Sequence, residues 1–191
     1  MLKKLSLLAC TLLIALTASA QGVERPKIVV GLVVDQMRWD YLYHYRDSYG
    51  EGGLRRLVDE GFSCENTMIN YLPTVTAIGH TSVYTGSVPA LHGIAGNNFI
   101  EDGVNKSSCG DETVQTVGSN TNKGQSSPHN LLAATIGDEL KLATDFKARV
   151  YGVAIKDRAA ILPAGHAANG AFWWDKKAGN FVTSTYYMDR L

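Results

Sequence analysis

The amino-acid sequence predicts an open α/β sheet with a small β excursion near its C-terminus. Two short apolar runs rich in β-branched residues, 27–34 and 149–155, are typical of strands buried on both faces of a parallel sheet. Between them, residues 130–144 carry apolar side chains at helical spacing. Strands that alternate with helices along the chain define this fold class.

The first half of the chain predicts two helices and a further strand. Residues 53–60 are typical of a helix that ends at Gly61. Residues 62–71 are expected to form a strand that Pro-Thr then interrupts. A second helix is expected to begin at Thr76 and to end before Gly86.

The second half predicts a long loop and a hairpin. Residues 109–128 are rich in Ser, Thr, Asn and Gly, which indicates an excursion over the surface. Near the end of the chain, a turn at 177–180 joins two apolar runs, 172–174 and 181–183. This hairpin is the predicted β excursion.

The first twenty residues predict a secretory signal peptide. Lys3 and Lys4 precede an apolar run at 5–16, and residues 18–20 supply the small side chains of a cleavage site. The mature segment, 21–191, is therefore expected to be exported to the periplasm or secreted, without stable insertion in a membrane.

The composition excludes several classes of protein. With 45% hydrophobic residues, the chain is not intrinsically disordered. The mature segment has a net charge of about −2, which excludes a nucleic-acid binder driven by bulk charge. It has no second long apolar stretch, so it is not a multispanning membrane protein.

Two cysteines lie outside the predicted signal, Cys64 and Cys109. In an oxidising compartment they are expected to pair as a disulfide. The alternative is one buried thiol and one exposed thiol in a loop.

Three residues stand where predicted strands end or a helix begins. Asp35 and Lys156 each follow a predicted strand, and Thr76 lies at a strand-to-helix turn. In open α/β sheets, chemistry gathers at the carboxyl ends of the strands. These positions are therefore candidates for a functional site.

Asp35, Thr76 and His80 each have a functional and a structural interpretation. Asp35 is a candidate oxygen ligand of a divalent metal, or a helix cap, or a partner of Arg38. Thr76 is a candidate nucleophile, which needs a base or a metal to lose its proton, or simply an N-cap. His80 is a candidate base or ligand, but a hydrogen-bonded structural histidine is favoured.

The other candidates carry amide or positive groups. Asn97, in a loop rich in glycine, either donates a hydrogen bond to a substrate oxygen or serves its own turn. Lys156 and Arg158, two residues apart in an extended chain, are expected to project to the same side while Asp157 points away. They form either a clamp for a dianion or a solvated charged turn.

Four stretches, in order along the chain, resemble the alkaline phosphatase superfamily. They are VVDQMRWDYL at 33–42, LPTVTAIGHTSVYTG at 72–86, GIAGNNF at 93–99 and KDRAAILPAGH at 156–166. The chain most resembles the exported, phosphate-irrepressible alkaline phosphatases with a threonine nucleophile, within the type I phosphodiesterase/nucleotide pyrophosphatase-like group. The resemblance covers nearly all of the mature segment and implies a three-layer α/β/α sheet, here incomplete.

The resemblance also implies an activity and a role for each candidate residue. It implies zinc-dependent hydrolysis of small-molecule phosphate monoesters, with two Zn²⁺ ions in a complete site. Thr76 would be the nucleophile that forms a phosphothreonine, and would bind one zinc ion together with Asp35. Asn97, Lys156 and Arg158 would contact the phosphoryl oxygens. Diesterase relatives lack the cationic pair, which favours monoesters.

The sequence departs from the family pattern in its metal ligands. Family members complete the two-zinc site with further Asp and His residues downstream, and none of the histidines here matches such a position. We therefore expect the N-terminal portion of a longer enzyme, which alone binds zinc poorly and hydrolyses almost nothing. Two alternatives remain: a phosphodiesterase or nucleotide pyrophosphatase, and a non-catalytic exported phosphate-binding protein.

Overall fold

The computed structural model describes residues 26–191, so the predicted signal peptide at 1–20 lies outside the described residues. The chain divides into two compact units between Val34 and Asp35. The described part of the first unit, 26–34, forms no helix or strand, and its apolar side chains are exposed. The strand predicted at 27–34 is therefore not formed. A strand needs a neighbour for its backbone hydrogen bonds, and no described strand pairs with this segment.

The second unit begins with short helices. These are α2 (Tyr41–His44), the 3₁₀ helix η1 (Arg46–Ser48) and α3 (Leu54–Glu60). Helix α3 confirms the helix predicted at 53–60. The strand predicted at 62–71 is wrong, because these residues are irregular, nearly all exposed and paired with no described strand.

Helix α4 (Thr76–Thr85) has the predicted start and end. Val75, with an extended backbone, is its N-cap, and Gly86 ends it in the left-handed conformation at φ 63°. Within residues 26–191, no helix is both long and apolar enough to cross a membrane.

A two-stranded hairpin that the sequence analysis did not predict follows helix α5 (Pro89–His92). Its strands are β1 (Asn98–Glu101) and β2 (Val104–Ser107), which pair in antiparallel fashion. Asp102 and Gly103 form the turn, with φ angles of 52° and 77°. An Asp-Gly pair is a strong signal for such a turn, so this hairpin was predictable.

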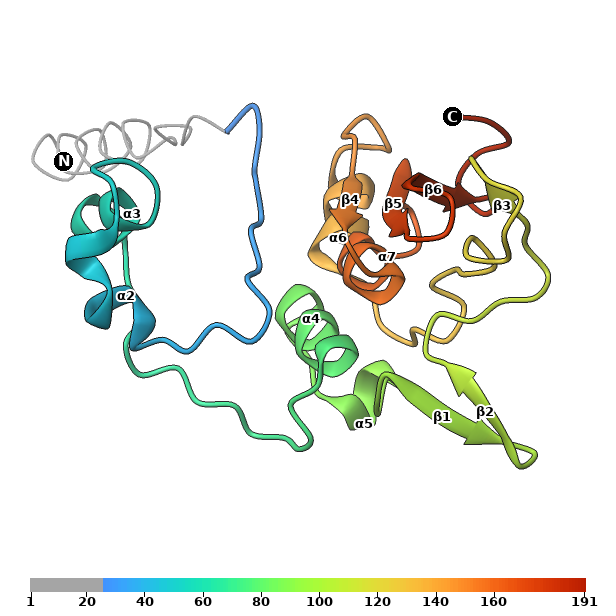
Figure 1. The fold of residues 1–191 in the computed structure, drawn as a ribbon, viewed down its shortest axis with the longest axis horizontal. Helices are drawn as coiled ribbons and strands as arrows, with labels where there is room; N and C mark the ends of the chain where they lie inside the picture. Colours follow the sequence, from blue (N-terminus) through green and yellow to red (C-terminus); the bar gives the residue numbers. More distant parts are fainter. Residues whose placement is uncertain (1–25) are drawn as a thin grey trace, which may run out of the picture. The chain divides into compact units, whose positions relative to one another are not determined.

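The larger sheet has four strands in the order β3-β6-β5-β4 (Figure 1). Strand β4 (Tyr151–Ala154) runs parallel to β5 (Gly170–Asp175). Strand β6 (Asn180–Ser184) is antiparallel to both β5 and β3 (Thr116–Val117). Strand β4 confirms the strand predicted near 149–155, and β5 and β6 form the predicted hairpin.

The segment predicted as a surface excursion, 109–128, is only partly exposed. It contributes β3 to the sheet and buries Cys109, Ser126 and Ser127. Cys64 is exposed, and both thiols are free. The expected disulfide is therefore not formed, because Cys109 packs within the hydrophobic core while Cys64 lies at the surface.

Helix α6 (Ile136–Ala143) begins later than the helix predicted at 130–144, because Thr135 caps it. Thr135 Oγ1 accepts a hydrogen bond from the Asp138 backbone N–H at 3.1 Å, and Asp138 Oδ2 accepts one from the Thr135 N–H at 2.9 Å. This reciprocal pair is a capping box, which fixes the first turn of a helix.

Helix α7 (Asp157–Ala164) packs against β4, β5 and α4 (Figure 1). A Cβ atom at Gly152 of β4 would collide with the Ala160 carbonyl of α7, so the strand and the helix approach closely only because residue 152 lacks a side chain. The buried side chains of the core that α7, β5 and β6 share are those of Ala160, Ile161, Leu162, Ala171, Trp173 and Val182.

The substitution Gly152→Ala is expected to lower the free energy of unfolding by about 1–3 kcal/mol, since the added methyl group must push α7 away from β4. Gly52→Ala is the matched control, because a Cβ there meets no atom within 4 Å. Urea unfolding followed by tryptophan fluorescence measures both variants. Equal stability of the two variants would contradict the close approach.

Candidate functional site

Thr76 and Asp35 contact one another although 41 positions separate them. Thr76 is the first residue of α4, and its Oγ1 donates a hydrogen bond to Asp35 Oδ2 at 2.8 Å. The alternative partner of Asp35, Arg38, binds Asp40 instead, at 2.8 Å. Thr76 is not the N-cap of α4, since Val75 occupies that position. Asp35 does not cap the following helix either, since the N-cap of α2 is Asp40. The structure thus joins a carboxylate to a hydroxyl, and the three structural alternatives for Asp35 and Thr76 are wrong.

Asn97 meets the same helix at its second residue. Asn97 Oδ1 accepts a hydrogen bond from the Ala77 backbone N–H at 2.9 Å. Because a backbone N–H group only donates, the oxygen of Asn97 faces α4 and its Nδ2 group keeps its donor capacity. Asp35, Thr76 and Asn97 therefore gather at the N-terminus of α4, where backbone N–H groups favour an anion.

A buried histidine that the sequence analysis gave no role holds this region together. His92 Nδ1 accepts the Ile94 backbone N–H at 3.1 Å, so Nε2 carries the hydrogen that it donates to Ser82 Oγ at 3.0 Å. Burial lowers the pKa of His92 and keeps the ring neutral. The ring ties α4 to the turn after α5, which leads to Asn97. The Ser82–His92 pair is not a nucleophile and base, because the histidine is the donor.

His80 has the structural role favoured from the sequence. Its Nδ1 lies 2.9 Å from the backbone carbonyl of Thr76, and a carbonyl only accepts, so Nδ1 carries the hydrogen. The side chain is nearly fully buried.

Lys156 and Arg158 lie at the start of α7: the backbone of Lys156 is extended, but Arg158 lies in the helix and not in extended chain as predicted. Lys156 is the N-cap and the helix begins at Asp157, whose Oδ1 accepts the Arg158 backbone N–H at 2.8 Å. The predicted alternation of side chains is therefore wrong, because it requires an extended chain and Asp157 begins a helix. Asp157 does not point away from Arg158, since its Oδ1 lies 3.6 Å from Arg158 Nη1. Within residues 26–191, no hydrogen bond or ion pair joins either cation to the three residues at the start of α4.

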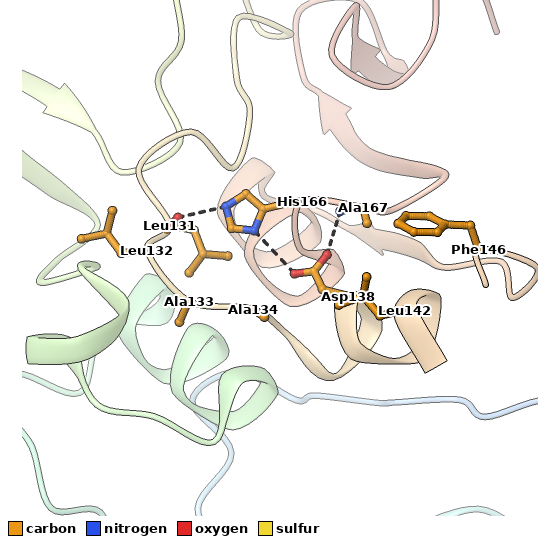
Figure 2. Close-up of a pocket in the computed structure, with 9 residues that line it drawn as sticks. All are labelled: Leu131, Leu132, Ala133, Ala134, Asp138, Leu142, Phe146, His166 and Ala167. Atoms are coloured by element: carbon orange, nitrogen blue, oxygen red, sulfur yellow. Dashed lines mark hydrogen bonds and ion pairs between the residues drawn. The ribbon is translucent and has the colours of Figure 1, made fainter. Parts of the chain in front are cut away.

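A second polar pair, Asp138 and His166, lies beside a cavity of 330 Å³ lined mainly by leucine and alanine side chains (Figure 2). His166 Nε2 donates to the Leu131 carbonyl at 2.9 Å, and Nδ1 lies 3.5 Å from Asp138 Oδ2. Asp138 Oδ1 also accepts the Ala167 backbone N–H at 2.7 Å. These bonds connect the loop before α6, α6 itself and the end of α7, so the pair has a structural role.

The two side chains shift one another's charge states. Burial acts to raise the pKa of Asp138, but hydrogen bonds from His166 and from backbone N–H groups outweigh it and hold this pKa well below its usual range. The bond to Asp138 raises the pKa of His166. Both ring nitrogens face acceptors, which favours the charged imidazolium.

The donor atoms of Asp35 and Thr76 fit part of a zinc site. Carboxylate and hydroxyl oxygens are suitable ligands, but a catalytic zinc ion normally has three protein ligands. Within the described range, 26–191, no three His, Cys, Asp or Glu side chains lie close enough together to hold a metal ion. Among residues 26–191, Asp35 and Thr76 thus offer two candidate donor atoms, fewer than a catalytic zinc ion needs.

Residues 29–190 match the family model of type I phosphodiesterases and nucleotide pyrophosphatases. The match covers most of the chain, which therefore belongs to this family. The membership predicted from the four sequence stretches is confirmed.

The chain is also similar to several curated proteins. It is 56% identical over 173 residues to the alkaline phosphatase PhoV of Synechococcus elongatus, a match that covers 90% of this chain and 32% of PhoV. It is 58% identical over 173 residues to the alkaline phosphatase PafA of Elizabethkingia meningoseptica, covering 89% and 32%. A Myroides odoratus protein named calcium-transporting ATPase is 59% identical over 186 residues, covering 96% and 34%. The chain thus spans about a third of the length of these relatives.

Solved structures confirm the predicted alkaline-phosphatase-like α/β fold. The crystal structure of wild-type PafA matches with a TM-score of 0.86 and 58% identity, over 88% of this chain and 33% of that chain. A PafA variant with one threonine, one asparagine, one lysine and one arginine substituted matches with the same TM-score, 56% identity and the same coverage.

His166→Gln is expected to cost more stability at pH 6 than at pH 9. The folded pKa of His166 is raised, so its charge stabilises the protein fully below the unfolded pKa of about 6.5, and this contribution is lost as pH rises through the folded pKa. Because the ring is partly exposed, solvent screening limits the difference to about 0.5–1 kcal/mol.

Urea unfolding of wild type and variant at both pH values tests this expectation. His129→Gln, at an exposed histidine, is the control. A His166→Gln effect of equal size at pH 6 and pH 9 would show that the ring acts only by packing.

Proposed function

We propose that this protein hydrolyses phosphate monoesters, with Thr76 as the nucleophile. The observation that carries the proposal is the hydrogen bond from Thr76 Oγ1 to Asp35 Oδ2, 2.8 Å long, at the N-terminus of α4. A threonine hydroxyl is a weak nucleophile until a neighbouring group helps to remove its proton. The names of PhoV and PafA, both alkaline phosphatases, support the reaction class.

In the proposed reaction, Thr76 Oγ1 bonds to phosphorus as the bond from phosphorus to the ester oxygen breaks. The hydroxyl proton leaves Oγ1 towards Asp35 Oδ2, which accepts its hydrogen bond in this structure, and passes on to the solvent, so that Asp35 is again a carboxylate. The departing alcohol takes up a proton from the solvent. Water then breaks the phosphothreonine bond, which restores the Thr76 hydroxyl and releases inorganic phosphate.

The phosphoryl oxygens would bind at the start of α4. The Ala77 N–H already donates to Asn97 Oδ1, so the other backbone N–H groups of the first turn would attract the anion. The Nδ2 group of Asn97 adds a side-chain donor whose direction is fixed by that bond. In the transition state the negative charge is spread over these oxygens, so donors held in advance stabilise it.

Lys156 and Arg158 would bind the remaining phosphoryl oxygens and favour monoesters, whose dianion carries one more charge than a diester. The buried Nε of Arg158 has no hydrogen-bond partner among the described residues, which leaves a donor for an oxyanion. The substituted PafA variant supports the choice of these four residues, Thr76, Asn97, Lys156 and Arg158. Its threonine and asparagine stand as far apart in sequence as Thr76 and Asn97, and its lysine and arginine as far apart as Lys156 and Arg158.

We propose zinc as the metal of this site. Asp35 and Thr76 would hold one of two Zn²⁺ ions, and a bound zinc ion lowers the pKa of a coordinated hydroxyl. The other ligands are not among residues 26–191, so the chain by itself is expected to bind zinc weakly and to turn over little substrate.

The proposal extends to the organisation of the chain. The basic start, apolar run and small residues of 1–20 support a signal peptide and export to the periplasm or beyond the cell. Residues 21–191 would then form the N-terminal part of an alkaline-phosphatase-like catalytic domain.

A second candidate function is hydrolysis of phosphodiesters or nucleotide pyrophosphates. The description of the matching family, which names both activities, favours it. A monoester presents more charged oxygens to the site than a diester does. Substitution of Lys156 or Arg158 should therefore affect the two activities to different extents.

Thr76→Ala is expected to lower kcat for para-nitrophenyl phosphate by at least about 100-fold, because no other hydroxyl replaces the nucleophile. Thr76→Ser should keep more activity, since serine retains a hydroxyl. The measurement uses the intact gene product with added zinc, and Thr74→Ala, at an exposed neighbour, is the control. Mass spectrometry after acid quenching should find phosphate on Thr76. Full turnover by Thr76→Ala would overturn the proposal.

Lys156→Ala is expected to lower kcat/KM for the monoester by about tenfold or more, and for bis-para-nitrophenyl phosphate by less than about threefold. Lys177→Ala, an exposed lysine in the turn between β5 and β6, controls for the loss of a surface charge. Equal losses on both esters, or a wild-type preference for the diester, would favour the second candidate function.

A further inference from the structure

Gln36, directly after Asp35, has a backbone conformation that glutamine rarely adopts. Its φ angle is 62°, in the left-handed region, which residues other than glycine, asparagine and aspartate seldom adopt because their backbone is strained there. The other non-glycine residues of this kind among 26–191 stand in a hairpin turn or just after a helix: Asp102, Asp145 and Phe146. Gln36 lies in neither setting.

The side chain of Gln36 does not explain this conformation. It is exposed, and no hydrogen bond from its amide occurs among the described residues. Strained backbone persists only where the surroundings require it, and it concentrates at functional sites. The reason for the left-handed conformation must therefore lie in the backbone of residue 36 and in the neighbouring residues, not in the glutamine side chain.

The residue directly before this strained backbone is Asp35. Residues 35 and 36 form a turn, and the Asp35 carboxylate points to Thr76 across 41 positions of sequence with a distance of 2.8 Å. Changing φ at Gln36 from its positive value to the usual negative one would redirect the chain at this turn. The carboxylate and the hydroxyl would then lose their alignment.

We propose that the left-handed backbone at Gln36 is a positioning device that directs the Asp35 carboxylate at the Thr76 hydroxyl, and that the glutamine amide has no part in it. This inference rests on the proposed function for its kinetic consequence. Gln36 contacts no reacting atom in this scheme, so it acts through Asp35 alone.

Two substitutions at one position separate backbone from side chain. Gln36→Gly removes the side chain but accepts the left-handed conformation freely, whereas Gln36→Val introduces a β-branched side chain that resists it. Asp102→Val is the matched control, because it places the same resistance at a left-handed residue in the hairpin turn between β1 and β2.

Steady-state kinetics of the intact gene product with para-nitrophenyl phosphate provide the first readout. Gln36→Gly should keep kcat within about twofold, while Gln36→Val should lower kcat by about tenfold or more with less than about threefold change in KM. Asp102→Val should lower the urea midpoint without lowering kcat. A loss in Gln36→Gly as large as in Gln36→Val would assign the role to the amide and overturn the proposal, as would full kcat in Gln36→Val.

A second readout does not depend on activity. A double-mutant cycle with Asp35→Asn and Thr76→Val, measured by urea unfolding, reports the coupling between the two side chains. The coupling should persist in the Gln36→Gly background and vanish in the Gln36→Val background. If Thr76→Ala is fully active, the proposed function fails while this cycle still decides the positioning role. Unchanged coupling in Gln36→Val would overturn that role.

Discussion

The site depends on how the first turn of α4 is held. Two side chains reach it from opposite directions along the sequence, Asp35 to the Thr76 hydroxyl and Asn97 to the Ala77 amide. The helix itself rests on α7, which in turn lies directly on β4 because residue 152 is a glycine. The close approach of α7 to β4 at Gly152 thus helps to set the position of α4, and with it the position of the Thr76 hydroxyl. Because interiors are close-packed, a displacement of α7 would be transmitted to α4.

Two histidines stabilise the scaffold by opposite electrostatic means. His92 is buried against a backbone donor, and this environment favours its neutral form. His166 has an acceptor at each ring nitrogen, and this environment favours its charged form. The region around α4 and α5 is therefore held without a titrating charge, whereas the junction of α6 with α7 contains an ion pair. The same residue type acts differently because its partners, and not its own chemistry, set its protonation.

Local sequence patterns correctly predicted helix ends and turns, which depend on neighbouring residues. They failed for features that depend on a partner distant in the sequence. Thr76 and Gly86 bound α4 as expected, and the hairpin of β5 and β6 follows from its turn. The β-branched run at 27–34 is not a strand here, because a strand needs a second segment to pair with. The sequence pattern of one segment does not show whether such a partner lies beside it.

The predicted site residues show the same division between local and distant effects. The order of the motifs indicated that Asp35 and Thr76 belong together, but their hydrogen bond and the orientation of Asn97 required coordinates. The extended geometry assumed for Lys156 and Arg158 was wrong because Asp157 begins a helix. The left-handed backbone of Gln36 has no signature in composition or spacing, since glutamine does not favour it.

The unpaired state of the cysteines has a practical consequence for spectroscopy. Cys109 is fully buried, and burial raises the pKa of its thiol well above the ordinary value, so a maleimide reagent finds no thiolate there. Cys64 is exposed in the irregular segment between α3 and α4. Among residues 26–191, a fluorophore or spin label therefore attaches to one position of the native protein, upstream of Thr76, with no need to remove the second thiol.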